Sequence, residues 1–277
     1  MDRLHAIIHQ LKSEVMQLKT KKHVLMAKRL KKTGDFVRKY FYATMSFVLV
    51  IQPVVKLVTK DKEPFFASYI PPSMGHIGML VFQEIMTAIS SCVCCYYICL
   101  DMNLMIEISI QIETLKDILR GSNDIGIIFD CIRRHEQIVR LVKNVQHILH
   151  VGMSISFFTG VLLFCTTSFK VLEMEATSSE LMFLLPYSLG VTFILFIHCW
   201  YGNDIIYRSA GISTAVFDSK WIGAKIPMQK TVILFIMFTK DPLRIQLAGG
   251  LFTMAIPFFI SICRTAYSAF TILQKFK

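Results

Sequence analysis

The stretch that decides the fold runs from Asp241 to Phe276 and reads DPLRIQLAGGLFTMAIPFFISICRTAYSAFTILQKF. In its second half, polar and apolar side chains each recur at steps of three or four residues, on opposite sides of a helix. The polar series is Ser261, Thr265, Ser268, Thr271 and Lys275, and the apolar series is Phe259, Ile262, Ala266, Phe270 and Leu273. The pattern predicts a membrane helix with one face toward water, although hydroxyls that bond back to their own backbone carbonyls would give the same spacing.

We place the start of this helix at Asp241 and Pro242. An acid is favourable at the positive end of the helix dipole, and a proline in the first turn lacks only a donor that the helix does not use. Gly249 and Gly250 would then leave one side of the helix without side chains, so that another helix can approach closely.

The composition predicts an integral membrane protein. The 277-residue chain is 54% hydrophobic, with a mean hydropathy of +0.53, which is too apolar for an ordinary soluble domain. Apolar segments near the length of a bilayer crossing occupy residues 41–58, 77–100, 151–169 and 181–202, and the C-terminal helix is the fifth. We therefore predict an all-α bundle of five transmembrane helices. The apolar run TVILFIMF, residues 231–238, is too short to cross and fits a cytoplasmic helix.

The chain divides into four regions. Residues 1–40 form a basic amphipathic helix, residues 41–202 a bundle of four spans, residues 203–244 a cytoplasmic segment, and residues 245–277 the C-terminal helix. Within the long loop 101–150, apolar residues step by three or four on both sides of Gly121–Gly126. This spacing predicts that the neighbouring spans continue as two antiparallel cytoplasmic helices joined by a turn.

The distribution of basic residues predicts the orientation. Lys and Arg number eleven in residues 1–40, six in 101–150 and six in 203–244, against two in 59–76, one in 170–180 and three after 245. By the positive-inside rule the N-terminus and both long loops are cytoplasmic, and five spans leave the C-terminus extracellular. The same flanking residues account for the net charge of +11, so we expect no nucleic-acid binding.

The sequence predicts neither an enzyme nor a metal site, and we expect no catalytic residue and no cofactor. It contains no G-x-S-x-G, no H-E-x-x-H and no glycine-rich phosphate loop. The ionisable residues Glu84 and His198 lie toward opposite ends of two spans, and Glu84 is better read as paired in the bundle or exposed to a water-filled vestibule. Cys92 and Cys95 form a C-x-x-C inside an apolar helix without a second ligand pair, which favours packing over chemistry.

Three stretches resemble the insect odorant receptors, a family of seven-span, odorant-gated cation channel subunits. AGG followed by an aromatic-rich run and TAYSAFTILQK resembles the last helix of that family. HCWYGNDIIYRSAGISTAVFDSKW, residues 198–221, resembles the passage out of its sixth helix, and CIRRHEQIVRLVKNVQHIL, residues 131–149, the approach to its fifth. The five spans then match the third to seventh of the family and the first two are missing, which leaves a partial gene model, a splice form and a non-functional copy as open explanations.

The resemblance implies a function and a set of partners. It implies an odorant-binding subunit of a ligand-gated nonselective cation channel, acting as a hetero-tetramer with the family's obligate co-receptor. The protein would cross the plasma membrane of a sensory neuron several times, in contact with membrane lipid. Residues 203–244 would belong to the anchor region through which the subunits meet. The alternatives are a gustatory-type receptor, or a membrane transporter or scaffold, although the internal repeats typical of transporters are not found.

The resemblance also implies a pore formed by the last helices of four subunits. TAYSAFTILQK places the gate at Ile272, where a ring of four apolar side chains would exclude water, with Ser268 one turn below and Gln274 at the mouth.

Recognition of a small volatile odorant requires a mostly apolar cavity with one or two polar groups. The outer halves of the spans supply such side chains, and packing without ligand contact is the alternative for each of them. The residues that we predict to contact the ligand are Ile51, Met79, Phe82, Met86 and Tyr187.

The orientation can be checked by cysteine labelling. A cysteine introduced at Asn123, in the loop 101–150, should resist an impermeant thiol reagent on intact cells and react after permeabilisation, because the loop is predicted to be cytoplasmic. Rapid labelling on intact cells would reverse the orientation.

Overall fold

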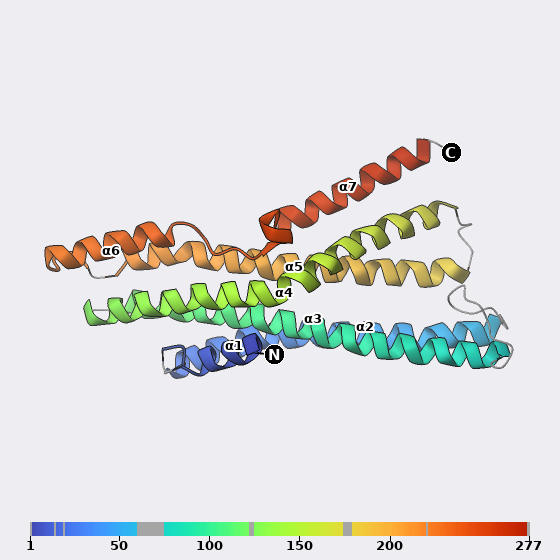
Figure 1. Ribbon diagram of the computed structural model, residues 1–277, viewed down its shortest axis with the longest axis horizontal. Coiled ribbons are helices and arrows are strands. Elements are labelled where there is room, and N and C mark those ends of the chain that lie inside the picture. The colour runs from blue at the N-terminus through green and yellow to red at the C-terminus, as the bar shows by residue number, and fades with distance from the viewer. Residues whose placement is uncertain are drawn as a thin grey trace.

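Long antiparallel helices account for most of the chain (Figure 1). The computed structural model describes residues 2–13, 15–18, 20–59, 75–121, 125–173, 179–219 and 221–275. Its helices are α1 (Asp2–Lys12), α2 (Lys21–Thr59), α3 (Gly75–Gly121), α4 (Ile125–Glu173), α5 (Ser179–Phe217), α6 (Ile226–Thr239) and α7 (Ile256–Lys275). Between α6 and α7 lie the two-residue strands β1 (Gln246–Leu247) and β2 (Phe252–Thr253), separated by a single 3₁₀ turn, η1 (Ala248–Gly250). The all-α class is confirmed.

Helices α3 and α4 are longer than a bilayer is thick. With 47 residues, α3 extends for about 70 Å, against about 30 Å for the hydrocarbon core. It runs through the predicted span and the first half of the loop 101–150 to Gly121, and α4, which begins at Ile125, runs back beside it (Figure 1). The predicted antiparallel extensions of the second and third spans are therefore confirmed.

In the described part of the chain, three helical segments are long and apolar enough to cross a membrane: Gly75–Gly121, Gly126–Thr167 and Ser188–Phe217. The first contains the predicted span 77–100, and the other two overlap most of the predicted spans 151–169 and 181–202. The other two predicted spans lie on α2 and α7, and the total of five stays a prediction.

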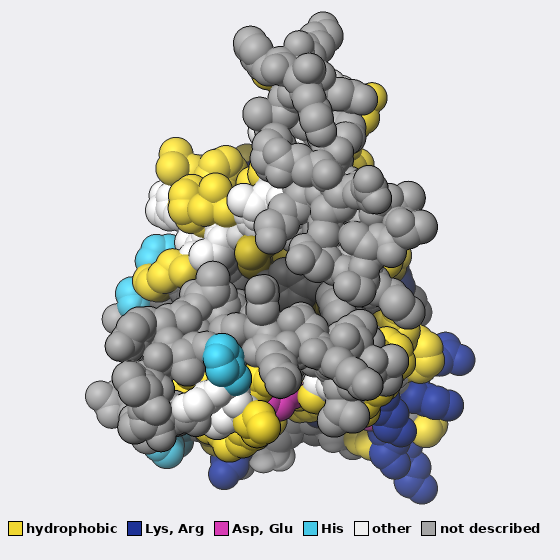
Figure 2. Space-filling view, turned by 90° about the vertical axis from the view of Figure 1, so that its right-hand side faces the viewer, with side chains coloured by type: hydrophobic (Ala, Val, Ile, Leu, Met, Phe, Trp, Pro, Cys, Tyr) yellow, Lys and Arg dark blue, Asp and Glu magenta, His cyan; other side chains and the backbone are white. Residues whose placement is uncertain are grey.

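The hydrophobic core lies mainly beyond the predicted membrane region. On α3, Ile108, Ile112, Leu115 and Leu119 have no exposed surface, and this half of the helix packs against α2, α4 and α5. By contrast, only 6% of the most apolar window of α3 is buried. Figure 2 views the bundle from its right-hand end in Figure 1 and shows hydrophobic side chains on the flanks of the described surface, with Lys and Arg gathered at the lower right. The membrane portion thus presents apolar side chains outward, as lipid contact requires.

The last helix does not begin at Asp241 and Pro242, so that prediction is wrong. Helix α7 starts at Ile256, and β1 and β2 form a small antiparallel hairpin before it. Gly249 and Gly250 have φ of 69° and 102°, a conformation that favours glycine, so they make the turn between the strands and do not thin a helix. Two adjacent glycines also cost about 1 kcal/mol each inside a helix, which explains why the helix starts after them.

The close approach expected at those glycines occurs at Gly202 of α5. A Cβ added there would lie 2.2 Å from the backbone oxygen of Met254. Gly202 therefore lets the segment before α7 pack directly on α5.

The first 40 residues do not form one helix, which corrects a second prediction. Helix α1 ends at Lys12, and α2 begins at Lys21 and continues without a break through the first predicted span. Helix α1 packs on α4, where the side-chain amide of Gln10 donates to the backbone oxygen of Gln137 at 2.6 Å.

Arg134 of α4 holds the turn between α1 and α2. Its guanidinium donates to the backbone oxygens of Val15 and Met16 at 2.6 and 3.3 Å, and to the side-chain oxygen of Gln111 on α3 at 2.7 Å. Arg134 is only 5% exposed, so these bonds form away from water. One side chain therefore ties the N-terminal turn to two helices of the core.

We expect Arg134→Ala to destabilise the protein by about 3 kcal/mol, because it leaves three buried acceptors without a donor. The exposed neighbour Arg133 provides the control, and Arg133→Ala should change stability by less than about 0.5 kcal/mol. Thermal unfolding in detergent, with proteolytic release of α1 as a second readout, measures both. Equal unfolding temperatures for the two variants would contradict the role assigned to Arg134.

Candidate functional site

A cavity of about 600 Å³ lies between α2, α3, α4 and α5. Its walls are mostly apolar, and α4 and α5 contribute Met153, Phe157 and Leu195. Volume and lining both fall in the range of small-molecule sites, which are concave, apolar and fitted with a few polar groups.

Two of the five predicted ligand residues line this cavity. Phe82 and Met86 do so from α3, and their side chains are 40% and 50% exposed, which places them at its open side. Ile51 on α2 and Met79 on α3 are not among the described residues that line it. Tyr187 lies in α5, but its side chain falls outside the described residues. Ligand contact stays a prediction for all five.

The cavity also contains residues that the sequence reasoning missed. Met153 and Phe157 come from α4, which contributed none of the predicted ligand residues. Asp101 lies one residue beyond the predicted second span and was placed in the cytoplasmic loop, and His198 was considered only as an isolated ionisable group. An acid directly after an apolar run is a usable signal, but its neighbour on another helix is visible only in the structure.

The polar floor of the cavity consists of Asp101, Tyr97 and His198. Asp101 has no exposed surface, and neither of its carboxylate oxygens has a hydrogen-bond partner. The Nε2 atom of His198 lies 3.7 Å from Oδ2 of Asp101, beyond hydrogen-bond length, and Nδ1 of His198 lies 2.7 Å from the backbone oxygen of Ile194. Since a carbonyl only accepts, Nδ1 carries a hydrogen and Nε2 faces the carboxylate.

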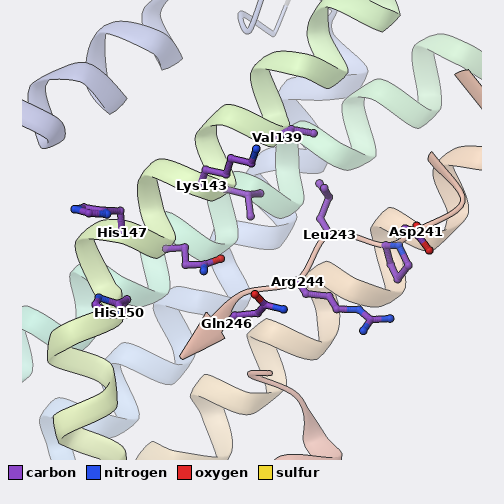
Figure 3. A pocket seen from close by; sticks show the side chains of 11 residues that line it. Val139, Lys143, His147, His150, Asp241, Leu243, Arg244 and Gln246 are labelled. Carbon is purple, nitrogen blue, oxygen red and sulfur yellow. The ribbon is translucent and has the colours of Figure 1, made fainter. Parts of the chain in front are cut away.

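A second, more open groove of about 650 Å³ lies between α4 and the segment 241–246 (Figure 3). Lys143, His147 and His150 follow one another along α4, and Arg244 with Asp241 lies on the facing segment. This groove is charged and open, so it suits a small apolar ligand less well than the cavity between α2 and α5.

Ion pairs connect α3 to α2 and α5 beyond the floor of the cavity. Asp117 of α3 accepts a hydrogen bond from the Lys22 ammonium of α2, and the Nε2 atom of His23 lies 3.1 Å from its other oxygen. The Lys22 bond, aided by His23, holds the pKa of the Asp117 carboxyl below its usual value. Arg208 of α5 likewise donates to Glu113 of α3 at 2.8 Å. These contacts therefore hold α2 and α5 against α3 beyond the cavity.

Comparison with known proteins identifies the family. The family model described as 7tm Odorant receptor matches residues 1–267. The chain belongs to this odorant receptor family. It is 23% identical over 146 residues to odorant receptor Or2 of Anopheles gambiae, covering 53% of this chain and 38% of that protein. It is 25% identical over 214 residues to odorant receptor 23a of Drosophila melanogaster, covering 72% of this chain and 55% of that receptor. The chain thus spans roughly two fifths to just over half of the length of these relatives.

The fold also matches a solved member of the family. The insect olfactory receptor OR5 from Machilis hrabei in complex with eugenol superposes with a TM-score of 0.77 at 16% identity, covering 99% of this chain and 75% of that receptor. The same receptor in a second structure gives 0.78 at 15% identity, covering 100% of this chain and 75% of that receptor. The family resemblance and the all-α membrane bundle are therefore confirmed.

Met86 and Met79 form a matched pair for testing the cavity. Both are methionines on α3, but only Met86 is among the described lining residues. Met86→Ala should weaken binding of a small apolar ligand by about three- to tenfold, since it removes apolar contact area, and Met79→Ala should have the smaller effect because Met79 is not among the described lining residues. Ligand titration of the purified protein by intrinsic fluorescence measures both. A larger loss from Met79→Ala would move the binding site away from this cavity.

Proposed function

We propose that the chain is an odorant-binding subunit of a ligand-gated nonselective cation channel, which acts with the family's co-receptor in the plasma membrane of a sensory neuron. The observation that supports this most directly is the apolar cavity of about 600 Å³ between α2 and α5, within a chain of the odorant receptor family. A relative with the same fold is described in complex with eugenol, a small aromatic molecule.

The placement of α7 supports a role in a pore. Helix α7 diverges from the rest of the bundle, and one of its faces packs on α4 and α5 (Figure 1). Ile262 and Ala266 lie on the packed face, whereas Ser268 and Ile272 are exposed. Ser268 and Ile272 are four residues apart and so share a face, which is left open in a single chain for neighbouring subunits. The side chain of Gln274 lies outside the described residues.

The proposal is tested by expressing the chain with an insect odorant receptor co-receptor in cells and recording currents across an odorant panel. The control is the co-receptor alone, because any response that depends on the chain must exceed it. We expect odorant-evoked currents that require both subunits. Surface expression of both without any such current would reject the function for this chain.

The proposed gate makes a separate prediction. In a conducting assembly, Ile272→Ala should raise the leak current, because a smaller side chain admits water to an apolar constriction. A cysteine at position 272 should also be blocked by thiol reagents applied from outside. Modification of cysteines at Thr271 or Leu273, without leak or block at 272, would mean that α7 is rotated and that Ile272 is not the gate.

A further inference from the structure

Among the described residues that line the cavity, buried polar atoms without a hydrogen-bond partner are found only at the floor. Along the walls, the hydroxyls of Thr87 and Thr159 donate to the backbone oxygens of Gln83 and Ile155, at 2.8 and 2.9 Å. At the floor, both oxygens of Asp101 and the hydroxyl of Tyr97 are buried without a hydrogen-bond partner. A buried polar group without a partner is costly, so such a group facing a cavity marks the position of a ligand's polar atom.

Two of the floor groups lie on α3 and the third approaches from α5. Tyr97 and Asp101 are four residues apart on α3 and share one face, and His198 approaches Asp101 from α5 with 3.7 Å between Nε2 and Oδ2. That distance is too long for a direct hydrogen bond, but one polar atom placed beside the pair can reach both within about 2.8 Å. A ligand hydroxyl at that point would lie within hydrogen-bond distance of both groups.

We propose that Asp101 binds the hydroxyl of a small alcohol or phenol whose apolar body fills the cavity. The carboxylate oxygens only accept hydrogen bonds, so they require a donor from the ligand, which esters, ethers and ketones lack. The ligand oxygen then accepts from Tyr97, whose hydroxyl is otherwise unpartnered. The inference rests on the proposed odorant-binding function and specifies the chemical class of the ligand.

The charges and the apolar walls of the cavity favour a neutral ligand over an anion or a cation. Among the described residues that line the cavity, Asp101 is the single acid, and neither Lys nor Arg is present to receive a carboxylate ligand. An ammonium ligand would lose more hydration than a neutral hydroxyl on entering a site walled by Phe157, Ile98 and Leu195. A neutral hydroxyl is desolvated at much lower cost and still provides the missing donor.

The test compares two isomers, 1-octanol and heptyl methyl ether, which share one formula and differ in the hydroxyl hydrogen. The purified chain in nanodiscs is loaded with a fluorescent apolar probe, N-phenyl-1-naphthylamine, and each ligand displaces it, with protein-free nanodiscs as the blank. We expect 1-octanol to bind about tenfold more tightly than the ether, as one hydrogen bond to a buried carboxylate implies.

Variants at Asp101 separate recognition from structural support. Asp101→Leu should reduce the tenfold preference to near one while the affinity for the ether changes less than about twofold, and the isosteric Asp101→Asn should keep part of the preference. Asp130, exposed on α4, provides the matched control, and Asp130→Asn should leave both affinities unchanged.

Equal displacement by both isomers in the unaltered chain would overturn the inference and leave the apolar site standing. An equal loss of both affinities in Asp101→Leu and Asp101→Asn would make Asp101 a structural clamp between α3 and α5, which also overturns it. Failure of both isomers to displace the probe from the unaltered chain would reject the cavity as an odorant site together with the inference.

Discussion

Burial of the C-terminal half of α3 is the interaction on which the rest of the structure depends. Residues from Met105 to Leu119 supply a series of fully buried apolar side chains that contact α2, α4 and α5. Full burial of one such side chain from water stabilises by about 1.5–3 kcal/mol, but this driving force is absent between helices already surrounded by lipid. The association of the long helices is therefore strongest where they leave the predicted membrane region.

This distribution explains the location of the cavity. Toward the right-hand end in Figure 1, α4, α5 and α7 spread away from α2 and α3, and the most apolar window of α3 is 6% buried. Because the core around the C-terminal half of α3 already fixes the helices relative to one another, their portions in the predicted membrane region need not fill every gap between them. The floor of the cavity lies at Asp101, near the start of the densely buried part of α3, where the open portion meets the packed core.

The sequence predicts the helices better than it predicts their ends and their neighbours. Periodicity in residues 101–150 predicted the extensions of the spans correctly, because those apolar stripes face a real core. The start of α7 was wrong because Asp241 and Pro242 fit a helix N-terminus locally, whereas the glycines at 249 and 250 adopt positive φ in a hairpin turn. The break after Lys12 was missed because it depends on Arg134, which is more than 100 residues away.

The candidate site shows the same division. That Phe82 and Met86 line the cavity could be predicted, because apolar bulk within a span is a local property of the sequence. The pairing of Asp101 with His198 could not, since it requires the register of α3 against α5, which hydropathy does not encode. Both residues also fell at the predicted ends of spans, where helix boundaries read from sequence are least certain.

The floor of the cavity is joined to the base of α7 through packed side chains. Phe157 lines the cavity, and its ring centre lies 6.4 Å from that of His198 and 5.5 Å from that of Phe258 on α7. One turn beyond His198, Gly202 receives the backbone of Met254 so closely that no side chain fits between them. Protein interiors are close-packed, so a ligand that displaces Phe157 must either move the Phe258 ring or open a void against it. Phe157 is therefore a side chain that lines the cavity and also packs against the first turn of α7.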